Sequence, residues 1–248
     1  MQKYIIFTDL DGTLLNHEDY TYDEALPMLK WLQNHRIPVV FTTSKTRQEC
    51  EILQEEMGLH DPFIVENGAA IYEGEKLLEV LGEPYEKIRQ CTGTFKEQFS
   101  LLPFSAMSVE EVMERTGFSY LQAKMAKERE YSEPFLIRDE RRLTELEVLA
   151  ETMGLKILKG GRFYHCVGIN QDKGEAVRRL KKRYPGYLSI GLGDNYNDVA
   201  MLDVVEVPIL IPHHKGRYIE YERKGLIRAK HKGSLGWRES LEEVLHAG

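Results

Sequence analysis

The stretch Tyr4-Ile5-Ile6-Phe7-Thr8-Asp9-Leu10-Asp11-Gly12-Thr13 joins a short apolar run to two carboxylates and a turn. The apolar residues 4–7 predict a buried strand. Asp9 and Asp11 are two positions apart, so their side chains point the same way from an extended backbone. Parallel sheets build their clefts at the carboxyl ends of strands, and a turn there leaves backbone N–H groups available to a phosphate. One carboxylate could attack phosphorus while the other protonates the leaving oxygen, although the pattern alone also fits an acidic turn.

A second acidic segment, Gly191-Leu192-Gly193-Asp194-Asn195-Tyr196-Asn197-Asp198, follows another predicted strand. Magnesium prefers hard oxygen ligands in near-octahedral geometry. Asp194 adds a third carboxylate to the first two, and Asp198 lies one helical turn further on. A Gly-Asp-Asn loop is also a common turn. We expect an Mg²⁺ ion to be held by Asp9, the backbone carbonyl of Asp11, Asp194 and Asp198, the last directly or through water.

Two single residues complete the predicted cleft. Thr43 follows the predicted strand 37–42, where a hydroxyl can hold a phosphoryl oxygen. Lys173 lies in the first turn of a helix that Asp172 caps, where an ammonium could neutralise the phosphate and the nucleophile. A lone Thr or Lys more often faces solvent. Together, however, the four segments supply a nucleophile, a proton carrier, metal ligands and phosphate donors at strand ends and helix starts.

Strand and helix patterns alternate at both ends of the chain. Alternation of this kind predicts an α/β fold, with a Rossmann-like, doubly wound parallel sheet. Thr21-Tyr22-Asp23-Glu24 is a candidate capping box, and Ser44 is a candidate cap for a helix that Gly58 ends. The predicted strands are 4–7, 37–42, 63–65, 188–192 and 207–211, with a hairpin at 71–72 and 77–80. The predicted helices are 21–36, 44–58, 172–184, 195–202 and 234–246.

The middle of the chain breaks this alternation. Helices are predicted at 84–99, 108–127 and 139–153, and strands at 134–137, 155–158 and 163–167. This arrangement predicts an inserted α+β unit. We therefore assign residues 1–82 and 171–248 to a catalytic core and residues 83–170 to a cap.

The composition excludes some classes of partner. The 248 residues include 42% hydrophobic and 29% charged residues, with a net charge of −7. Nucleic acids and anionic membranes need a clustered basic surface, so a small phosphorylated molecule is the expected partner. Cys50, Cys91 and Cys166 show no zinc or disulfide spacing. The apolar N-terminal run is too short for a signal peptide, and no run approaches the length of a membrane span, so we expect a cytoplasmic protein.

The four segments together resemble the motifs of the haloacid dehalogenase-like phosphatases, over nearly the whole chain, and the insert resembles the type 2 cap of that superfamily. The resemblance implies that Asp9 forms an aspartyl-phosphate and that Asp11 is the general acid and base. It also implies that Thr43 and Lys173 hold the transferring phosphoryl group. The catalytic residues expected on this basis are Asp9, Asp11, Thr43 and Lys173.

Within that superfamily the chain is most similar to the mannosyl-3-phosphoglycerate phosphatases. The residues that carry this likeness are 44–47, 65–68, 126–131 and 161–165, the last two in the predicted cap. Residues 232–237 are also similar, but Ser234-Leu235 stands where we expect Pro-Glu. The likeness implies dephosphorylation of mannosyl-3-phosphoglycerate to mannosylglycerate. The expected substrate-binding residues are Thr43, Ser44, Lys45, Asn67, Lys127, Arg129, Arg162, His165 and Lys173.

Several alternatives stay open at this point. The substrate could be another sugar phosphate, such as glucosyl-3-phosphoglycerate, sucrose phosphate or trehalose phosphate. The chain could also be a phosphomutase or a non-catalytic phosphosugar binder. The sequence does not give the oligomeric state or the conformation of the cap. Asn67 either reaches the cleft or only forms a turn, and His213-His214 is expected in a surface loop.

Overall fold

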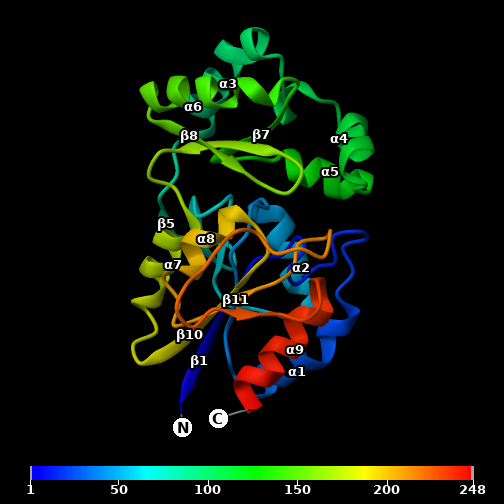
Figure 1. The fold of residues 1–248 in the computed structure, drawn as a ribbon, viewed down its shortest axis with the longest axis vertical. Helices are drawn as coiled ribbons and strands as arrows, with labels where there is room; N and C mark the ends of the chain where they lie inside the picture. Colours follow the sequence, from blue (N-terminus) through cyan, green and yellow to red (C-terminus); the bar gives the residue numbers. More distant parts are fainter. Residues whose placement is uncertain (1, 247–248) are drawn as a thin grey trace.

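A computed structural model describes residues 2–246, and Figure 1 shows two stacked units, each built on its own sheet. The lower unit holds a parallel sheet in the order β12-β11-β10-β1-β2. Because β1 has β10 on one side and β2 on the other, the loops after these three strands meet at one edge. The strands are β1 (Lys3–Thr8), β2 (Val39–Phe41), β10 (Tyr187–Gly193), β11 (Val207–Leu210) and β12 (Ile227–Arg228).

Helices cover both faces of this sheet. Alternate residues of β1 serve the two faces: Ile6 packs with one buried cluster, and Ile5 and Phe7 pack with the other. The Ile6 cluster includes side chains of α1 (Leu26–Asn34), α2 (Arg47–Met57) and α9 (Gly233–His246). The opposite cluster includes side chains of α7 (Lys173–Lys181) and α8 (Val199–Leu202). The predicted α/β fold with a doubly wound parallel sheet is therefore confirmed.

A small antiparallel sheet extends the core. It contains β3 (Phe63–Val65), β4 (Ala70–Glu73) and β5 (Lys76–Val80), in that order. A parallel bridge between Thr42 and Ile64 attaches it to the end of β2. The predicted hairpin is the β4–β5 pair.

The upper unit is an antiparallel sheet in the order β6-β7-β9-β8 with helices packed on it. Its strands are β6 (Leu101–Pro103), β7 (Ser132–Ile137), β8 (Leu155–Lys159) and β9 (Tyr164–Gly168). One buried cluster joins this sheet to α3 (Tyr85–Phe99) and α6 (Leu143–Thr152). A separate cluster joins α4 (Val109–Thr116) and α5 (Tyr120–Lys127) to η2 (Phe104–Ala106). The other short 3₁₀ helices are η1 (Asp23–Ala25), η3 (Glu140–Arg142) and η4 (Tyr196–Asp198).

Three local predictions are wrong. The helix predicted over 108–127 is divided into α4 and α5 at Gly117, whose φ of 79° ends α4. Thr21 caps no helix, because its hydroxyl donates to Asp19. The cap of α2 is Thr46, which forms a capping box with Glu49, and not Ser44.

The two units meet through a buried carboxylate. Glu66, at the end of β3, accepts hydrogen bonds from the backbone N–H groups of Glu130 and Tyr131 and from the Ser132 hydroxyl. Gln171 donates to the carbonyl of Glu66 from the second crossing between the units. These contacts fix the insert over the carboxyl edge of the core sheet, and we propose 83–170 as the cap. Within residues 2–246, no helix is both long and apolar enough to cross a membrane.

Candidate active site

Carboxylates gather at the edge where β1 and β10 end. Asp9 continues β1, and its backbone N–H donates to Leu192 of β10. Asp9, Asp194 and Asp198 are all buried, and each offers an oxygen within 4.8 Å of the others. The sequence places these residues far apart, and the parallel pairing of β1 with β10 brings them together.

Lys173 lies between two of these carboxylates. Its Nζ is 2.6 Å from Asp9 Oδ1 and 2.6 Å from Asp198 Oδ1, and its side chain is fully buried. Asp172 caps α7 by accepting from the Glu175 N–H, which fixes Lys173 in the first helical turn. Burial lowers the pKa of Lys173, but Asp198 and Asp9 outweigh burial and raise it. Lys173 is therefore a permanent cation in this site.

The Asp9 carboxyl is held in an unusual electrostatic environment. Burial, together with Asp198, raises the pKa of Asp9 to about 7, and Lys173 opposes this shift. Burial, Asp9 and Asp198 raise the pKa of Asp194 well above its ordinary value. Concentrating negative charge in a buried place is unfavourable unless a cation joins it.

Asp198 fixes the loop that carries Asp194. Its Oδ2 accepts from the backbone N–H groups of Asp194 and Asn195, each at 3.0 Å. Its Oδ1 holds Lys173, so hydrogen bonds engage both oxygens. A Cβ at Gly193 would come within 2.4 Å of the Asp198 Cβ, so only glycine allows this approach.

The donor set fits a hard divalent cation. Among the described residues, Asp194 has no basic side chain within ion-pair distance, although it is buried. A carboxylate cluster with one uncompensated member offers hard oxygen ligands and excess negative charge, which such a cation needs. Gly12 has a φ of +88°, and a Cβ there would lie 2.6 Å from Asp194 Oδ2. Glycine at this position therefore avoids a collision with the Asp194 carboxylate.

Asp11 faces the cleft rather than the buried cluster. About a third of its side chain is exposed, and its Oδ1 lies 2.9 Å from Lys45 Nζ. The structure thus brings Asp11 and Asp9 to one site, with Asp9 deeper and Asp11 nearer to solvent. Lys45 also lies 3.4 Å from Glu49 Oε1.

Thr43 follows β2 and Asn67 follows β3, and a backbone hydrogen bond joins the two residues. The Thr43 hydroxyl is buried and accepts from the backbone N–H of Lys45, and its carbonyl accepts from the Asn67 N–H. The Asn67 side chain accepts from Asn197, while its own Nδ2 is buried without a hydrogen-bond partner in the part of the chain described. Asn67 therefore joins two of the loops that border the carboxylates, in addition to forming a turn with Gly68.

Core and cap side chains together line a cleft above these residues. Residues from both units, including several aromatic rings, form its walls. The cleft is lined by Asp9, Asp11, His17, Tyr20, Ser44, Lys45, Glu49, Phe104, Thr116, Phe118, Arg129, Pro134, Gly160, Gly161, Arg162, Phe163, His165, Asp194, Asn195, Asn197 and His213.

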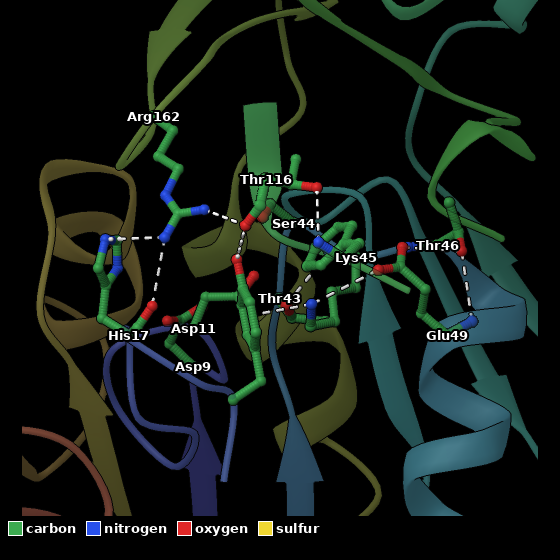
Figure 2. A network of polar contacts seen from close by, with 12 residues as sticks. Asp9, Asp11, His17, Thr43, Ser44, Lys45, Thr46, Glu49, Thr116 and Arg162 are labelled. Carbon is green, nitrogen blue, oxygen red and sulfur yellow. Dashed lines mark hydrogen bonds and ion pairs between the residues drawn. The ribbon is translucent and has the colours of Figure 1, made fainter. Parts of the chain in front are cut away.

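Arg162 reaches down from the cap to the core. Its guanidinium donates to the carbonyls of Thr116 and His17, and its Nη2 is 3.5 Å from His17 Nε2 (Figure 2). Within residues 2–246, no carboxylate lies within ion-pair distance of it. Arg162 is thus a cation at the cleft with neutral partners only.

Arg129 links the cap to the core, and Lys127 does not reach the cleft. Arg129 donates to Ser44 O at 2.6 Å and to Ala126 O at 2.7 Å. Lys127 instead donates to the carbonyls of Phe104 and Met107. Its ammonium satisfies backbone groups inside the cap, so the expected contact between Lys127 and substrate is not supported.

His213 and His214 lie in the partly exposed loop after β11, as expected, and together with His17 they form a histidine group that borders the cleft. The rings of His17 and His214 stack with centroids 4.1 Å apart, and those of His213 and His214 are 3.8 Å apart. Burial, His214 and Arg162 lower the pKa of His17 to about 4. The long-range contact with His17 was not visible in the sequence, which shows only an isolated pair.

His165 is a buried, neutral histidine on β9. Its Nδ1 has no hydrogen-bond partner among the described residues, and it lies at the cleft. Burial, together with the nearby cations Arg129 and Lys173, lowers the pKa of His165 to about 3. A neutral imidazole with a free nitrogen suits a hydroxyl of an incoming ligand.

His165 should make the fold sensitive to acid. Its pKa is 6.5 when unperturbed and about 3 in the fold, so below pH 6.5 the unfolded chain binds a proton that the folded chain excludes. Stability should fall as pH falls from 6.5 toward 3. Both proteins should lose free energy of unfolding between pH 7 and pH 4. We expect the loss in His165→Gln to be roughly 1–3 kcal/mol smaller than the loss in the wild type. Urea unfolding at both pH values measures this.

The control for that measurement is His60→Gln, which replaces an exposed histidine. It should retain the pH dependence of the wild type. If His165→Gln and the wild type lose the same free energy, His165 is not held neutral by the fold.

Comparisons with known proteins agree with this geometry. Residues 6–158 match the family model described as haloacid dehalogenase-like hydrolase. A glucosyl-3-phosphoglycerate/mannosyl-3-phosphoglycerate phosphatase of Persephonella marina is 44% identical over 261 residues, which cover 98% of this chain and 97% of that protein. A protein of the same name from Methanococcoides burtonii is 37% identical, with the same coverage.

Solved structures share the fold. A Thermoplasma acidophilum protein superposes with a TM-score of 0.77 at 16% identity, covering 98% of both chains. The sucrose-phosphatase of Synechocystis, solved with sucrose and phosphate, superposes with a TM-score of 0.71 at 14% identity and 98% coverage of both chains. At these identities the likeness concerns the fold alone.

Proposed function

The chain belongs to the haloacid dehalogenase-like hydrolase family, and we propose that it is a phosphatase of mannosyl-3-phosphoglycerate, with the glucosyl compound as an alternative substrate. The observation that carries the proposal is the Asp9 carboxylate, 2.6 Å from the Lys173 ammonium, below a cleft that Asp11 faces. The names of the two relatives support the choice of substrate.

The proposed reaction proceeds in two displacements. An Asp9 oxygen bonds to phosphorus while the bond from phosphorus to the sugar-bearing alkoxide breaks, and Asp11 gives that alkoxide a proton. Asp11 then takes a proton from water, which attacks phosphorus, releases inorganic phosphate and regenerates the Asp9 carboxylate. In the proposed mechanism, Lys173 and Thr43 hold the charge on the phosphoryl oxygens during both steps. Positioning and electrostatics do most of the catalysis in phosphoryl transfer.

We propose Mg²⁺ as the cation of the carboxylate cluster. The residues that would hold it are Asp9, the Asp11 carbonyl, Asp194 and Asp198, the last through water because its oxygens already accept hydrogen bonds. When bound, this ion neutralises phosphoryl oxygens and helps to align them.

The substrate of the relatives carries a phosphate and a carboxylate. We propose that Arg162 binds the carboxylate, because its guanidinium offers paired donors and has no anionic partner among the described residues. Lys45 and Arg129, by contrast, already have carboxylates beside them. Ser44, Asn67 and His165 remain proposed contacts of the substrate.

Arg162→Ala should weaken binding of the carboxylate-bearing substrate selectively. We expect KM for mannosyl-3-phosphoglycerate to rise about 10–100-fold, the size of a lost charge-assisted pair. Turnover of an aryl phosphate, which has no carboxylate, should change less than about threefold. The matched control is Arg141→Ala, an exposed cap arginine paired with Asp139. Equal losses on both substrates would argue against carboxylate recognition by Arg162.

The function is tested by phosphate release from a panel of substrates. The panel contains mannosyl- and glucosyl-3-phosphoglycerate, sucrose phosphate and trehalose phosphate, with Mg²⁺ or with EDTA. We expect phosphate release from the phosphoglycerate esters in Mg²⁺ and none in EDTA. Preference for another sugar phosphate would overturn the substrate, and a phosphorylated product in place of free phosphate would indicate a mutase. No release from any substrate would favour a non-catalytic binder.

We also propose a cytoplasmic location and a small-molecule partner. The described cysteines are buried and unpaired, which agrees with a reducing compartment. The net charge of −7 is unfavourable for nucleic acid.

A further inference from the structure

Glu49, in the first turn of α2, is a buried carboxylate that the sequence reasoning did not single out. Its Oε2 accepts from the backbone N–H of Thr46 at 2.9 Å and from the Thr46 hydroxyl at 3.0 Å. The Thr46 hydroxyl in turn accepts from the Glu49 N–H, which completes a capping box. In most helices, this arrangement only satisfies free N–H groups at the helix start.

In this fold the same carboxylate also lies beside two cations of the cleft. Its Oε1 is 3.4 Å from Lys45 Nζ, and its Oε2 is 3.9 Å from Arg129 Nη2. All three side chains are at most 7% exposed. Lys45 belongs to the core and Arg129 to the cap, so Glu49 holds one cation from each unit.

Lys45 also faces the predicted proton carrier. Its Nζ lies 2.9 Å from Asp11 Oδ1, with the rings of Tyr20 and Phe118 at 5.5 and 5.2 Å. Among the described residues, Asp11 and Glu49 are the carboxylates within ion-pair distance of Lys45. Glu49 is therefore the second carboxylate that holds the Lys45 ammonium in the cleft.

Arg129 is anchored to the same segment. Its Nη1 donates to the Ser44 carbonyl, next to Lys45, and the Thr46 hydroxyl also lies 3.1 Å from the Met125 carbonyl of the cap. Figure 2 shows Lys45, Thr46 and Glu49 on one side of Asp9 and Asp11, with Arg162 on the other. One wall of the cleft, formed by Lys45, Glu49 and Arg129, thus pairs its cations with a carboxylate. On the other side, the Arg162 guanidinium has no anionic partner among the described residues.

We propose that Glu49 is a positioning residue for substrate selection. Its charge fixes Lys45 and Arg129 in the wall that receives the leaving group, next to Asp11. This inference rests on the proposed phosphatase function, because it assigns the wall to the glycosyl part of that substrate, while Arg162 binds the carboxylate. A phosphate ester whose leaving group does not reach this wall gains nothing from Glu49.

Glu49→Gln tests the charge without removing the helix cap, because Gln also serves in a capping box. The matched control is Glu111→Gln, which makes the same change in the Ser108–Glu111 capping box of α4, away from the cleft. Kinetics are measured with Mg²⁺ on mannosyl-3-phosphoglycerate and on p-nitrophenyl phosphate. Glu49→Gln should raise KM for the sugar ester at least about 10-fold, within the size of a charge-assisted contact. Its constants for the aryl phosphate, and both sets for Glu111→Gln, should stay within about threefold.

Two kinetic results would overturn the proposal: equal losses on both substrates, or wild-type KM values in Glu49→Gln. A crystal structure of the variant adds a readout that does not depend on the substrate. The cap bonds to Thr46 should persist, while Lys45 Nζ and Arg129 Nη2 move away from residue 49 and Arg129 keeps its bonds to Ser44 and Ala126. Unchanged positions of both cations would also overturn the proposal. A wild type that hydrolyses the aryl phosphate but no sugar ester would refute the proposed substrate, and the crystal structure would still decide the role of Glu49.

Discussion

Asp9→Asn is expected to lower kcat for phosphate release by at least about 10³-fold, since loss of a catalytic nucleophile commonly costs this much or more. The amide is nearly the same size as the carboxylate but is a very poor nucleophile toward phosphorus. Asp11, Lys173 and the cleft remain in place, so the loss isolates the covalent step. Steady-state phosphate release with the mannosyl compound and Mg²⁺ measures it.

The main control for Asp9→Asn is the integrity of the amide. Mass spectrometry before and after the assay excludes deamidation to Asp, which would restore wild-type enzyme. Turnover within about tenfold of the wild type, with deamidation excluded, would refute the aspartyl-phosphate scheme.

The same variant should fold at least as well as the wild type when no metal is present. Burial raises the pKa of Asp9 from 3.8 to about 7, so ionised Asp9 costs the folded state free energy. The stability associated with the neutral carboxyl is complete below pH 3.8 and is lost as pH rises through 7. At pH 8 the asparagine avoids that cost, and the melting temperature of Asp9→Asn should not be below that of the wild type. This result separates lost chemistry from lost folding.

The sequence predicted the site well where local rules apply. Asp9 and Asp194 follow strands that the apolar runs revealed, and parallel strands place their carboxyl ends at one edge. Lys173 follows a visible cap residue, Asp172. For these residues, the order of elements along the chain was sufficient to predict proximity, while their catalytic roles stay predictions.

The cap was less predictable because its contacts join distant segments. Lys127 resembled a ligand of the substrate, but its ammonium is held by carbonyls of η2 and its neighbour Met107. His213 looked isolated until the fold placed His17 against it. No local pattern encodes which carbonyl or ring a long side chain will meet after the cap has folded.

Glu49 shows an intermediate case. The spacing of Thr46 and Glu49 is a capping-box signal that was present in the sequence. Because Ser44, two residues earlier, was the predicted cap, the capping box of Thr46 and Glu49 was missed. Even with the right cap, the sequence would not show that Arg129 of another unit shares this carboxylate.

Lys173→Met is expected to abolish turnover and also to destabilise the fold. The methionine keeps much of the alkyl length but removes the ammonium that lies 2.6 Å from both Asp9 and Asp198. Two buried carboxylates then remain without this partner, beside a third in Asp194. Breaking a buried ion pair from one side costs about 3–5 kcal/mol, because the remaining charge stays desolvated.

The pH dependence of the lost stability in Lys173→Met tests whether unpaired carboxylate charge causes the loss. Lys173 at present opposes the rise in the pKa of Asp9, so without it Asp9 should bind a proton more readily at neutral pH. The stability deficit should be largest above pH 7 and should shrink as pH falls, because protonation removes the unpaired charge. Urea unfolding at pH 8 and pH 5 measures the change. The control is Lys181→Met on the same helix, whose Glu206 partner is half exposed and whose loss should cost less than about 1 kcal/mol.

Catalysis and stability should respond differently to added metal in Lys173→Met. A divalent cation neutralises the carboxylates, so Mg²⁺ should recover part of the lost stability by binding the folded state. It should not restore turnover, because the ammonium contacts Asp9 and, in the proposed mechanism, also holds the transferring phosphoryl group. Recovery of both stability and turnover with Mg²⁺ would reduce Lys173 to a structural counter-ion. Recovery of stability without turnover would show that neutralising the carboxylates restores the fold, whereas turnover needs the Lys173 ammonium itself.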